Sequence, residues 1–369
     1  MYQNLFEAIV NVTEFTPLES DMFEIIAAYE KDLKEQSNIS FNPFVIGCCG
    51  QINTKLNMEH ETSFNKFLRE GNFSVLSLFD GMSCGQIALN RIGLKPKQYF
   101  ASEIKRCAIE TTKLHYPDTI HLGDVTKIKA EDLPQIDLLI GGSPCQDFSQ
   151  GNKERKGLQG TKSKLFFEYL RLLKELKPKY WLFENVMMYD KDYMIISEYL
   201  GTEPVRINSN LITAQHRDRY YWTNIGPESF DLFGNRTCAI PQPRNKFITL
   251  QSILTEGYTD LVKARCLVTN SGSLISNPDS MYKRYTTTGM VNIIFNSPDF
   301  DYKKGIRFLN KTEMERLQTV PENYTEHLTE KQTMNLMGDG WTIDVIAHIF
   351  SFLKGEEKNL LKLVTESSI

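Results

Sequence analysis

The chain changes character at Ser74, from which residues 74–91 read SVLSLFDGMSCGQIALNR. The apolar run from Val75 to Phe79 is typical of a buried strand. The segment Asp80–Gly85, with glycines at 81 and 85, is typical of a turn, and a helix is predicted from Gln86. The same pattern then repeats, and it predicts further strands at 99–102, 122–125, 136–140 and 180–183. Strands that alternate with helices indicate a doubly wound, mostly parallel α/β sheet.

Residues 228–300 interrupt this alternation. They are rich in Asn, Ser, Pro and Thr, and helical spacing returns only at 312–317, 329–337 and 343–354. We therefore predict four parts of the chain: a mainly helical N-terminal extension at 1–72, an α/β domain at 73–227, a small irregular domain at 228–303, and a C-terminal segment at 304–369 that returns to the α/β domain.

Composition and charge argue against several classes of protein. The net charge is −4, and no apolar run approaches the roughly 18 residues of a membrane span. The N-terminus lacks the pattern of a signal peptide, so a cytoplasmic location is the expectation. Seven cysteines without a C-x-x-C pair argue against a disulfide framework and against a metal site. Residues 1–70 hold 5 Lys/Arg against 11 Asp/Glu, whereas residues 201–310 hold 13 against 9, so a phosphate-contacting surface is expected only in the second segment.

One cysteine follows a predicted strand directly. The sequence Gly141-Gly142-Ser143-Pro144-Cys145-Gln146 comes straight after the apolar run 136–140. The thiol is therefore expected at the carboxyl rim of the sheet, where open α/β folds bind ligands. Proline and glycine stiffen such a turn and keep the sulfur exposed, which suits an attacking thiolate. A buried structural cysteine is the alternative for this segment on its own.

Acidic residues accompany three successive strand ends. Asp80 and Gly81 open the turn after the first strand, Glu103 follows the second, and Asp124 follows the third. An acid placed about 20 residues after a glycine turn, as Glu103 is, takes the ribose hydroxyls of an adenosine cofactor. Asp124 could accept from the adenine amino group. A glycine turn alone commonly connects two elements without binding a ligand. Together with acids at the next two strand ends, it indicates an adenosine site.

Charged residues also mark later strands. Glu184 ends the fifth predicted strand, on the same rim as Cys145, and could hold or protonate a ring nitrogen of a substrate; capping a helix is the alternative. Arg217 and Arg219 stand two residues apart in an extended segment, so their side chains point the same way. They could hold a carbonyl oxygen or a phosphate, although a solvated edge strand would also explain them.

Together these features resemble the cytosine-5 DNA methyltransferases, and within that family the de novo branch. Six motifs match in the family's order: the first cofactor motif at 79–85, the catalytic loop at 142–146, the acid motif at 184–186, the substrate-arginine motif at 215–219, the motif that organises the target domain at 307–318, and the last cofactor motif at 337–341. The resemblance implies a Rossmann-like, class I S-adenosyl-L-methionine-dependent methyltransferase. Residues 73–227 would be its catalytic domain and 228–303 its target-recognition domain.

The resemblance also implies a role for each site residue. Cys145 would add to C6 of a cytosine flipped out of double-stranded DNA, Glu184 would hold N3, and Arg219, helped by Arg217, would bind O2. Asn185 would order the Cys145 loop. The implied S-adenosyl-L-methionine site comprises Phe79, Asp80, Gly81, Gly85, Glu103, Ile104, Asp124, Val125, Ser143, Pro144, Leu165, Asp339, Gly340 and Trp341.

Three positions depart from the family pattern. Ser83, a small residue, stands where many members have glycine, Ile104 stands where many members have an aromatic residue that stacks on adenine, and Asp339 replaces the usual asparagine. A carboxylate at position 339 leaves the choice and the affinity of the cofactor open.

The sequence predicts a DNA (cytosine-5-)-methyltransferase that forms 5-methylcytosine, in a bacterial or phage restriction-modification setting. A transfer RNA cytosine-5 methyltransferase is one alternative, but the Cys-Phe-Thr element usual there is not found in this sequence. A catalytically silent DNA-binding regulator is the other, and the intact thiol, acid and arginines argue against it. Three points stay open: the target sequence, the role of residues 1–72 in packing or protein contact, and a homodimer, for which Phe166 and Phe167 offer either a core or a dimer surface.

Overall fold

The computed structural model describes residues 70–144, 164–231, 234, 236–269, 277–289 and 291–354. The chain divides into two units, residues 1–60 and 61–369, and all the described residues belong to the second. The helical extension expected at 1–72 lies outside the described residues except for its last three, and Cys145 lies outside them too.

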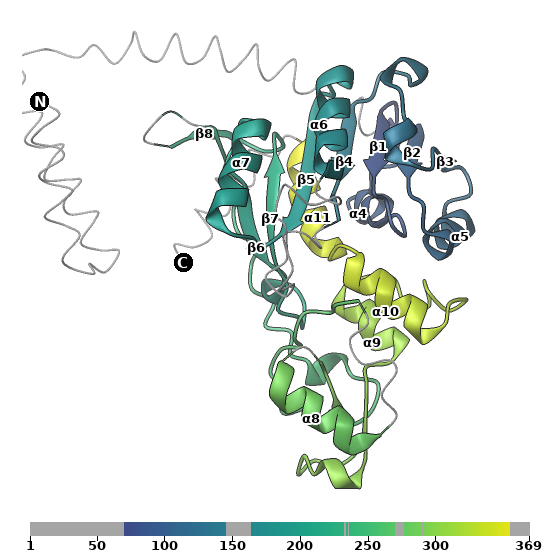
Figure 1. Cartoon of the computed structure of the whole chain (residues 1–369), viewed down its shortest axis with the longest axis vertical. Helices are drawn as coiled ribbons and strands as arrows, with labels where there is room; N and C mark the ends of the chain where they lie inside the picture. Colours follow the sequence, from purple (N-terminus) through teal and green to yellow (C-terminus); the bar gives the residue numbers. More distant parts are fainter. Residues whose placement is uncertain are drawn as a thin grey trace, which may run out of the picture. The chain divides into compact units, whose positions relative to one another are not determined.

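A seven-stranded sheet organises the second unit, with the strand order β3-β2-β1-β4-β5-β7-β6 (Figure 1). Neighbouring strands among β1 to β5 pair in parallel, whereas β7 runs antiparallel to both β5 and β6. The mostly parallel α/β sheet predicted from the sequence is thus confirmed. The strands are β1 (Ser74–Leu78), β2 (Gln98–Ser102), β3 (Ile120–His121), β4 (Leu138–Gly141), β5 (Tyr180–Val186), β6 (Val205–Asn208) and β7 (Asp218–Thr223).

Two apolar clusters pack on the sheet because successive side chains of a strand alternate in direction. In β1, Val75 belongs to the first cluster, whereas Leu76 and Leu78 belong to the second. Helices that contribute to the first cluster are α4 (Cys84–Arg91), α5 (Arg106–His115), α9 (Lys311–Leu317), α10 (Glu330–Asp339) and α11 (Ile343–Ser351). Those of the second are α6 (Lys164–Leu176) and α7 (Asp190–Leu200). On α6, Phe166 is fully buried in this cluster and Phe167 is 37% exposed.

The third strand lies earlier in the chain than its apolar pattern predicts. It spans Ile120–His121 rather than 122–125, although the Leu122 amide still donates to the Ala101 carbonyl of β2. The chain then turns at Gly123, whose φ of 73° is a left-handed conformation that favours glycine. Asp124 caps a short 3₁₀ helix, Val125–Lys127. The acid therefore sits in a turn beyond the strand.

The segment expected to be irregular contains two small antiparallel sheets. One pairs β8 (Glu228–Phe230) with β9 (Arg236–Cys238), and the other pairs β10 (Ile294–Phe295) with β11 (Ile306–Arg307). Helix α8 (Pro278–Thr288), drawn away from the seven-stranded sheet in Figure 1, contributes Met281 and Tyr285 to a separate apolar cluster. Leu250 and Ala264 instead belong to the first cluster of the main sheet. The boundaries proposed at 228 and 303 stay predictions.

An ion pair fastens this segment to α9. Both Glu313 oxygens accept from the Arg307 guanidinium, at 2.7 and 2.8 Å, and Oε1 also accepts from the Thr255 amide at 2.9 Å. Because Glu313 is fully buried, it acts as the junction between the irregular segment and the helix. This arrangement agrees with the organising role implied for the motif at 307–318. Within the described ranges, we find no helix with the length and hydropathy needed to cross a bilayer.

Candidate active site

A cavity of about 600 Å³ lies at the carboxyl ends of β1, β2, β4 and β5; we call it the central cavity. All the residues predicted to bind the cofactor line it except Gly85. The complete lining is Phe79, Asp80, Gly81, Cys84, Ser102, Glu103, Ile104, Lys105, Gly123, Asp124, Val125, Gly142, Ser143, Pro144, Leu165, Glu184, Asn185, Val186, Arg217, Arg219, Leu336, Gly338, Asp339, Gly340 and Trp341.

Gly85 faces the sheet instead. It is buried near the start of α4, and a Cβ there would lie 2.3 Å from Ile140 Cδ1 and 2.7 Å from the Tyr99 hydroxyl. The glycine is therefore needed for close packing of the helix on the sheet. A part for Gly85 in binding the cofactor stays a prediction, and the structure shows it only as support for the turn.

The turn after β1 is held by side chains that it carries itself. Ser83 precedes α4 with a φ of 63°, where glycine is favoured, and its hydroxyl donates to Asp80 Oδ2 at 2.5 Å. The Tyr99 hydroxyl donates to Asp80 Oδ1 at 2.9 Å. The Gly81 amide donates to Glu103 Oε2 at 2.8 Å, which ties the turn to the end of β2. Serine is therefore compatible with this position because its hydroxyl fixes the turn.

The acids after β2 and β3 keep oxygen atoms available for a ligand. Glu103 Oε1 accepts from the amides of Ile104 and Lys105, at 2.8 and 2.7 Å, and this fixes the direction of the carboxylate. Asp124 accepts hydrogen bonds from the amide and the hydroxyl of Thr126, both at Oδ1. Its Oδ2 accepts from no donor within the described residues. Backbone and side-chain donation from Thr126 lowers the pKa of Asp124.

Burial raises the pKa of two groups in the wall of the cavity, which keeps the proton on each of them to a higher pH. It raises the pKa of Asp80 to about 6, despite hydrogen bonds from Ser83 and Tyr99. It also raises the pKa of the Cys84 thiol to about 12, so this cysteine is protonated at neutral pH and is not a nucleophile. Asp80 thus titrates closer to neutral pH than an ordinary carboxyl group does.

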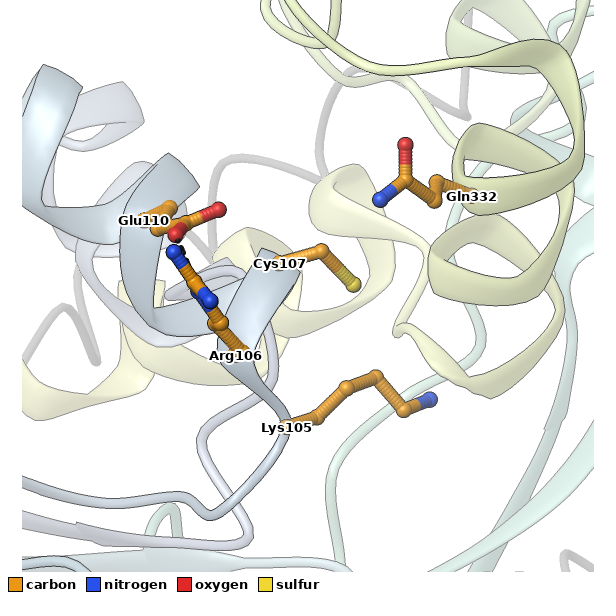
Figure 2. A pocket seen from close by; sticks show the side chains of 5 residues that line it. All are labelled: Lys105, Arg106, Cys107, Glu110 and Gln332. Atoms are coloured by element: carbon orange, nitrogen blue, oxygen red, sulfur yellow. Dashed lines mark hydrogen bonds and ion pairs between the residues drawn. The ribbon is translucent and has the colours of Figure 1, made fainter.

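An ion pair joins two parts of the lining. The ammonium of Lys105, which precedes α5, lies 2.7 Å from Asp339 Oδ2 at the end of α10. Lys105 also borders a neighbouring hollow of about 480 Å³, which Arg106, Cys107, Glu110 and Gln332 complete (Figure 2). Ile104, 77% exposed, offers an apolar surface beside the pair. The carboxylate that distinguishes this chain at position 339 is therefore neutralised by a lysine.

At the other end of the cavity, Glu184 is held by two donors. Its Oε1 lies 3.1 Å from Nε of Arg219, and its Oε2 accepts from the indole Nε1 of Trp341 at 3.0 Å. Only 8% of Glu184 is exposed. The pairing register explains the contact between Glu184 and Arg219. Val186 of β5 lies opposite Arg219 of β7, and Glu184, two residues before Val186, has its side chain on the same face of the sheet. Glycine is required next to the carboxylate, since a Cβ at Gly142 would lie 2.7 Å from Oε2.

Arg217 is also buried, at 4% exposure, and most of its partners are backbone carbonyl groups. Its Nη2 donates to the carbonyls of Gly338 and Gly340, at 3.0 and 2.7 Å, and its Nη1 donates to that of Leu267 at 3.1 Å. The guanidinium therefore anchors the end of α10 to the sheet. Its predicted contact with the substrate stays a prediction, while Arg219 is the arginine that contacts Glu184.

Asn185 supports the turn that leads to the cysteine loop. Its amide nitrogen donates to the carbonyl and the hydroxyl of Ser143, at 3.4 and 3.3 Å. Its side-chain oxygen accepts from the Val186 amide at 2.8 Å. These contacts fit the ordering role implied for Asn185, although they stop at Ser143.

Some contributors to the site carry no signal in the sequence that we could use. Lys105 follows Glu103 in an ordinary polar segment, and Cys266 is one of seven scattered cysteines, yet its sulfur contacts both Arg217 and Arg219. The opposite charges of Lys105 and Asp339 could have suggested that they pair. No comparable rule would have selected Cys266.

The parallel sheet, the acids that follow its strands and the carboxylate–arginine pair in one cavity define a Rossmann-like, class I methyltransferase fold. The chain belongs to the C-5 cytosine-specific DNA methylase family, whose family model matches residues 73–194 and 210–355. This is a family of S-adenosyl-L-methionine-dependent enzymes that act on DNA. No group of three or more metal-binding side chains occurs within the described ranges.

Individual relatives agree with this family. The chain is 36% identical over 188 residues to the orphan methyltransferase M.Rho11sI of Bacillus phage rho11s, a match that covers 47% of this chain and 37% of the phage protein. It is 29% identical over 307 residues to the type II methyltransferase M1.ScrFI of Lactococcus lactis subsp. cremoris, with 75% and 77% covered. The chain thus spans little more than a third of the first relative and about three quarters of the second.

A solved structure shows the same fold. The Entamoeba histolytica methyltransferase EhMeth superposes with a TM-score of 0.55 and 17% sequence identity, over 77% of this chain and 98% of that one.

Proposed function

We propose that the chain is a DNA (cytosine-5)-methyltransferase that binds S-adenosyl-L-methionine in the central cavity and methylates a cytosine flipped out of double-stranded DNA. One observation carries the proposal: the same cavity is lined by Asp80 and Glu103 at one end and by the Glu184–Arg219 pair at the other. The first end suits an adenosine cofactor and the second suits the polar edge of a pyrimidine. Methyl donor and acceptor would therefore meet in one enclosed space.

The residues present fit the cofactor. Glu103 would accept from the ribose hydroxyls, and Asp124 Oδ2 from the adenine amino group, while Ile104 would cover the adenine face. Asp339 presents no unpaired charge because Lys105 neutralises it. S-adenosyl-L-methionine, when bound, supplies an electrophilic methyl group on a positively charged sulfur. A carboxylate such as Asp80 in the wall of the cavity favours a cation of this kind.

The catalytic residues would act on the cytosine ring. The Cys145 thiolate adds to C6 and forms an S–C6 bond, and the ring electrons move toward N3, where Glu184 holds the proton. Arg219 stabilises the charge that develops on O2. The resulting enamine makes C5 nucleophilic enough to accept a methyl group. Loss of the C5 proton then restores the C5–C6 double bond and expels the thiolate.

Glu184 has the geometry for this role. Arg219 and Trp341 donate to its two oxygens from different sides, so the carboxylate has one orientation. Asn185 holds Ser143, two residues before the thiol. A ring placed between these elements would present N3 to the acid and O2 to the arginine.

Transfer of tritium from labelled S-adenosyl-L-methionine tests the proposal, with duplex DNA and transfer RNA as parallel acceptors. We expect label in DNA with the wild-type chain and none with Cys145→Ala, whereas Cys238→Ser, a substitution of a half-buried cysteine in β9, should stay active. Label in transfer RNA and not in DNA would overturn the choice of substrate. DNA that contains 5-fluorocytosine should trap the Cys145 adduct, because fluorine cannot leave C5 as a proton does.

The biological setting belongs to the same proposal. Relatives named type II and orphan methyltransferases support a bacterial or phage modification enzyme. A homodimer and a protein contact through residues 1–72 stay predictions. The exposed ring of Phe167 on α6 is the described feature most relevant to a dimer.

A further inference from the structure

Within the described residues, Arg217 and Arg219 differ in their charged partners. Glu184 pairs with Arg219 at 3.1 Å. Arg217 is 4% exposed, and no carboxylate within the described residues forms an ion pair with it; its oxygen partners are the backbone carbonyls described above. A buried guanidinium without a negative partner is costly to desolvate. A negatively charged group beside Arg217 would offset this cost.

Cys266 occupies the position where that group is needed. Its Sγ accepts from Nη1 of Arg217 at 3.3 Å and from Nη2 of Arg219 at 3.8 Å. The sulfur thus bridges the two guanidinium groups and is half-buried beside them. Burial acts to raise the pKa of this thiol, but the charges of Arg217 and Arg219 and their hydrogen bonds outweigh burial and lower it.

The surroundings of the sulfur favour the ionised form. A neutral thiol would donate to the Leu267 carbonyl over 3.5 Å, whereas guanidinium donors of Arg217 and Arg219 are directed at the sulfur, which therefore acts as an acceptor. The charged groups near the cluster in the described part of the chain include Glu184 of β5, Asp218 of β7, which pairs with Arg206, and Asp80 and Asp339 of the cavity lining. Asp339 is paired with Lys105. The thiolate would place a negative charge 3.3 Å from Nη1 of Arg217.

We propose that Cys266 is the thiolate counter-ion of Arg217 and Arg219 and that it positions the Arg219 guanidinium beside Glu184 for substrate binding. The positioning role rests on the proposed function, whereas the ionic state of the sulfur does not. Cys266 is a positioning residue: it acts through Arg219 and forms no bond to the substrate. A neutral side chain at 266 would leave Arg217 unbalanced and free Arg219 to change its orientation.

The ionic state can be measured without activity. Ultraviolet absorbance reports thiolate, so the difference between the wild-type chain and Cys266→Ser, titrated from acid to alkaline pH, isolates this sulfur. We expect the difference signal to appear at a lower pH than the corresponding signal from Cys238→Ser, since burial raises the pKa of Cys238. Equal midpoints, or a later one for Cys266, would overturn the counter-ion.

The positioning role is tested by substitutions that remove or restore the negative charge at position 266. Cys266→Ser and Cys266→Ala should lower kcat by about 10-fold to about 100-fold, the upper figure being the cost of a misplacement of roughly 1 Å. Cys266→Asp restores a negative charge and should recover most of the rate, and a cooperative thermal unfolding transition checks that each variant is folded. If serine and aspartate variants have the same kcat, positioning by charge is wrong. If the wild-type chain itself transfers no methyl group, the proposed function fails, and the absorbance titration still decides the counter-ion.

Discussion

Asp80→Asn should remove a pH dependence from the stability of the fold. The wild-type carboxyl is buried in the wall of the central cavity, and burial raises its pKa from 3.8 to about 6. The Ser83 and Tyr99 hydroxyls donate to different oxygens of Asp80, so asparagine, with one carbonyl oxygen, loses one of these hydrogen bonds, and it does so at every pH. Asparagine keeps the shape of the side chain. It carries no charge at any pH. The variant therefore isolates the cost of ionising a carboxyl group in this position.

The sign and size follow from linkage. A folded pKa above the unfolded one means that the folded state holds the proton more tightly, so stability is lost as pH rises from about 3.8 to about 6. A shift from 3.8 to about 6 corresponds to about 3 kcal/mol when the carboxyl is fully ionised in both states. Between about pH 5 and about pH 7.5, roughly 1.4 kcal/mol of that cost appears, because part of it is already present at the lower pH.

Urea unfolding at these two pH values measures the effect for both proteins. We expect the free energy of unfolding of Asp80→Asn, relative to wild type, to rise by about 1.4 kcal/mol from the lower to the higher pH. The same substitution at Asp132, which is exposed, controls for the loss of one charge. A constant difference between variant and wild type across the range would refute the argument from burial.

Three other substitutions test the remaining contacts. Gly142→Ala places a Cβ 2.7 Å from Glu184 Oε2, so methyl transfer should slow on the order of 100-fold in single-turnover assays; an unchanged rate would show that the carboxylate moves freely. Asp339→Asn breaks a half-exposed ion pair with Lys105 that is worth about 0 to 1 kcal/mol, so cofactor affinity measured by calorimetry should change less than about tenfold and lose part of its salt dependence. Glu313→Gln should lower the free energy of unfolding by about 1.5 to 3 kcal/mol in urea, because the fully buried Glu313 loses the charge that strengthens its hydrogen bonds from Arg307; a loss under about 1 kcal/mol would contradict this.

The parts of the fold that the sequence predicts are those with local causes. Val75 to Phe79 and 136–140 are apolar over the length of one strand, and the chain can only bury such runs inside a parallel sheet. The acids Glu103 and Glu184 then fall at the same rim because parallel strands end together. The third strand was misplaced for the complementary reason. Leu122 and Val125 look like a strand, but Gly123 turns the chain between them.

The rest of the site depends on contacts between residues far apart in the chain. Trp341 donates to Glu184 across 157 positions, and Arg217 donates to Gly340 across 123. No periodicity encodes such pairs, since each depends on how the C-terminal helices dock on the sheet. The motifs predict that these residues lie in one site. The antiparallel register of β5 and β7 then determines which arginine contacts Glu184.

The segment Gly338–Trp341 connects the two ends of the cavity. On one side, Gly338, Asp339 and Gly340 line the part that suits the cofactor. On the other, the same backbone accepts both hydrogen bonds from Arg217 Nη2, and its last residue fixes Glu184. Any displacement of this segment must therefore move an arginine and the acid together. A ligand that fixes the position of this segment would therefore also fix Arg217 and Glu184, through the same hydrogen bonds. By these contacts, binding of the proposed cofactor would orient the residues proposed to hold the base.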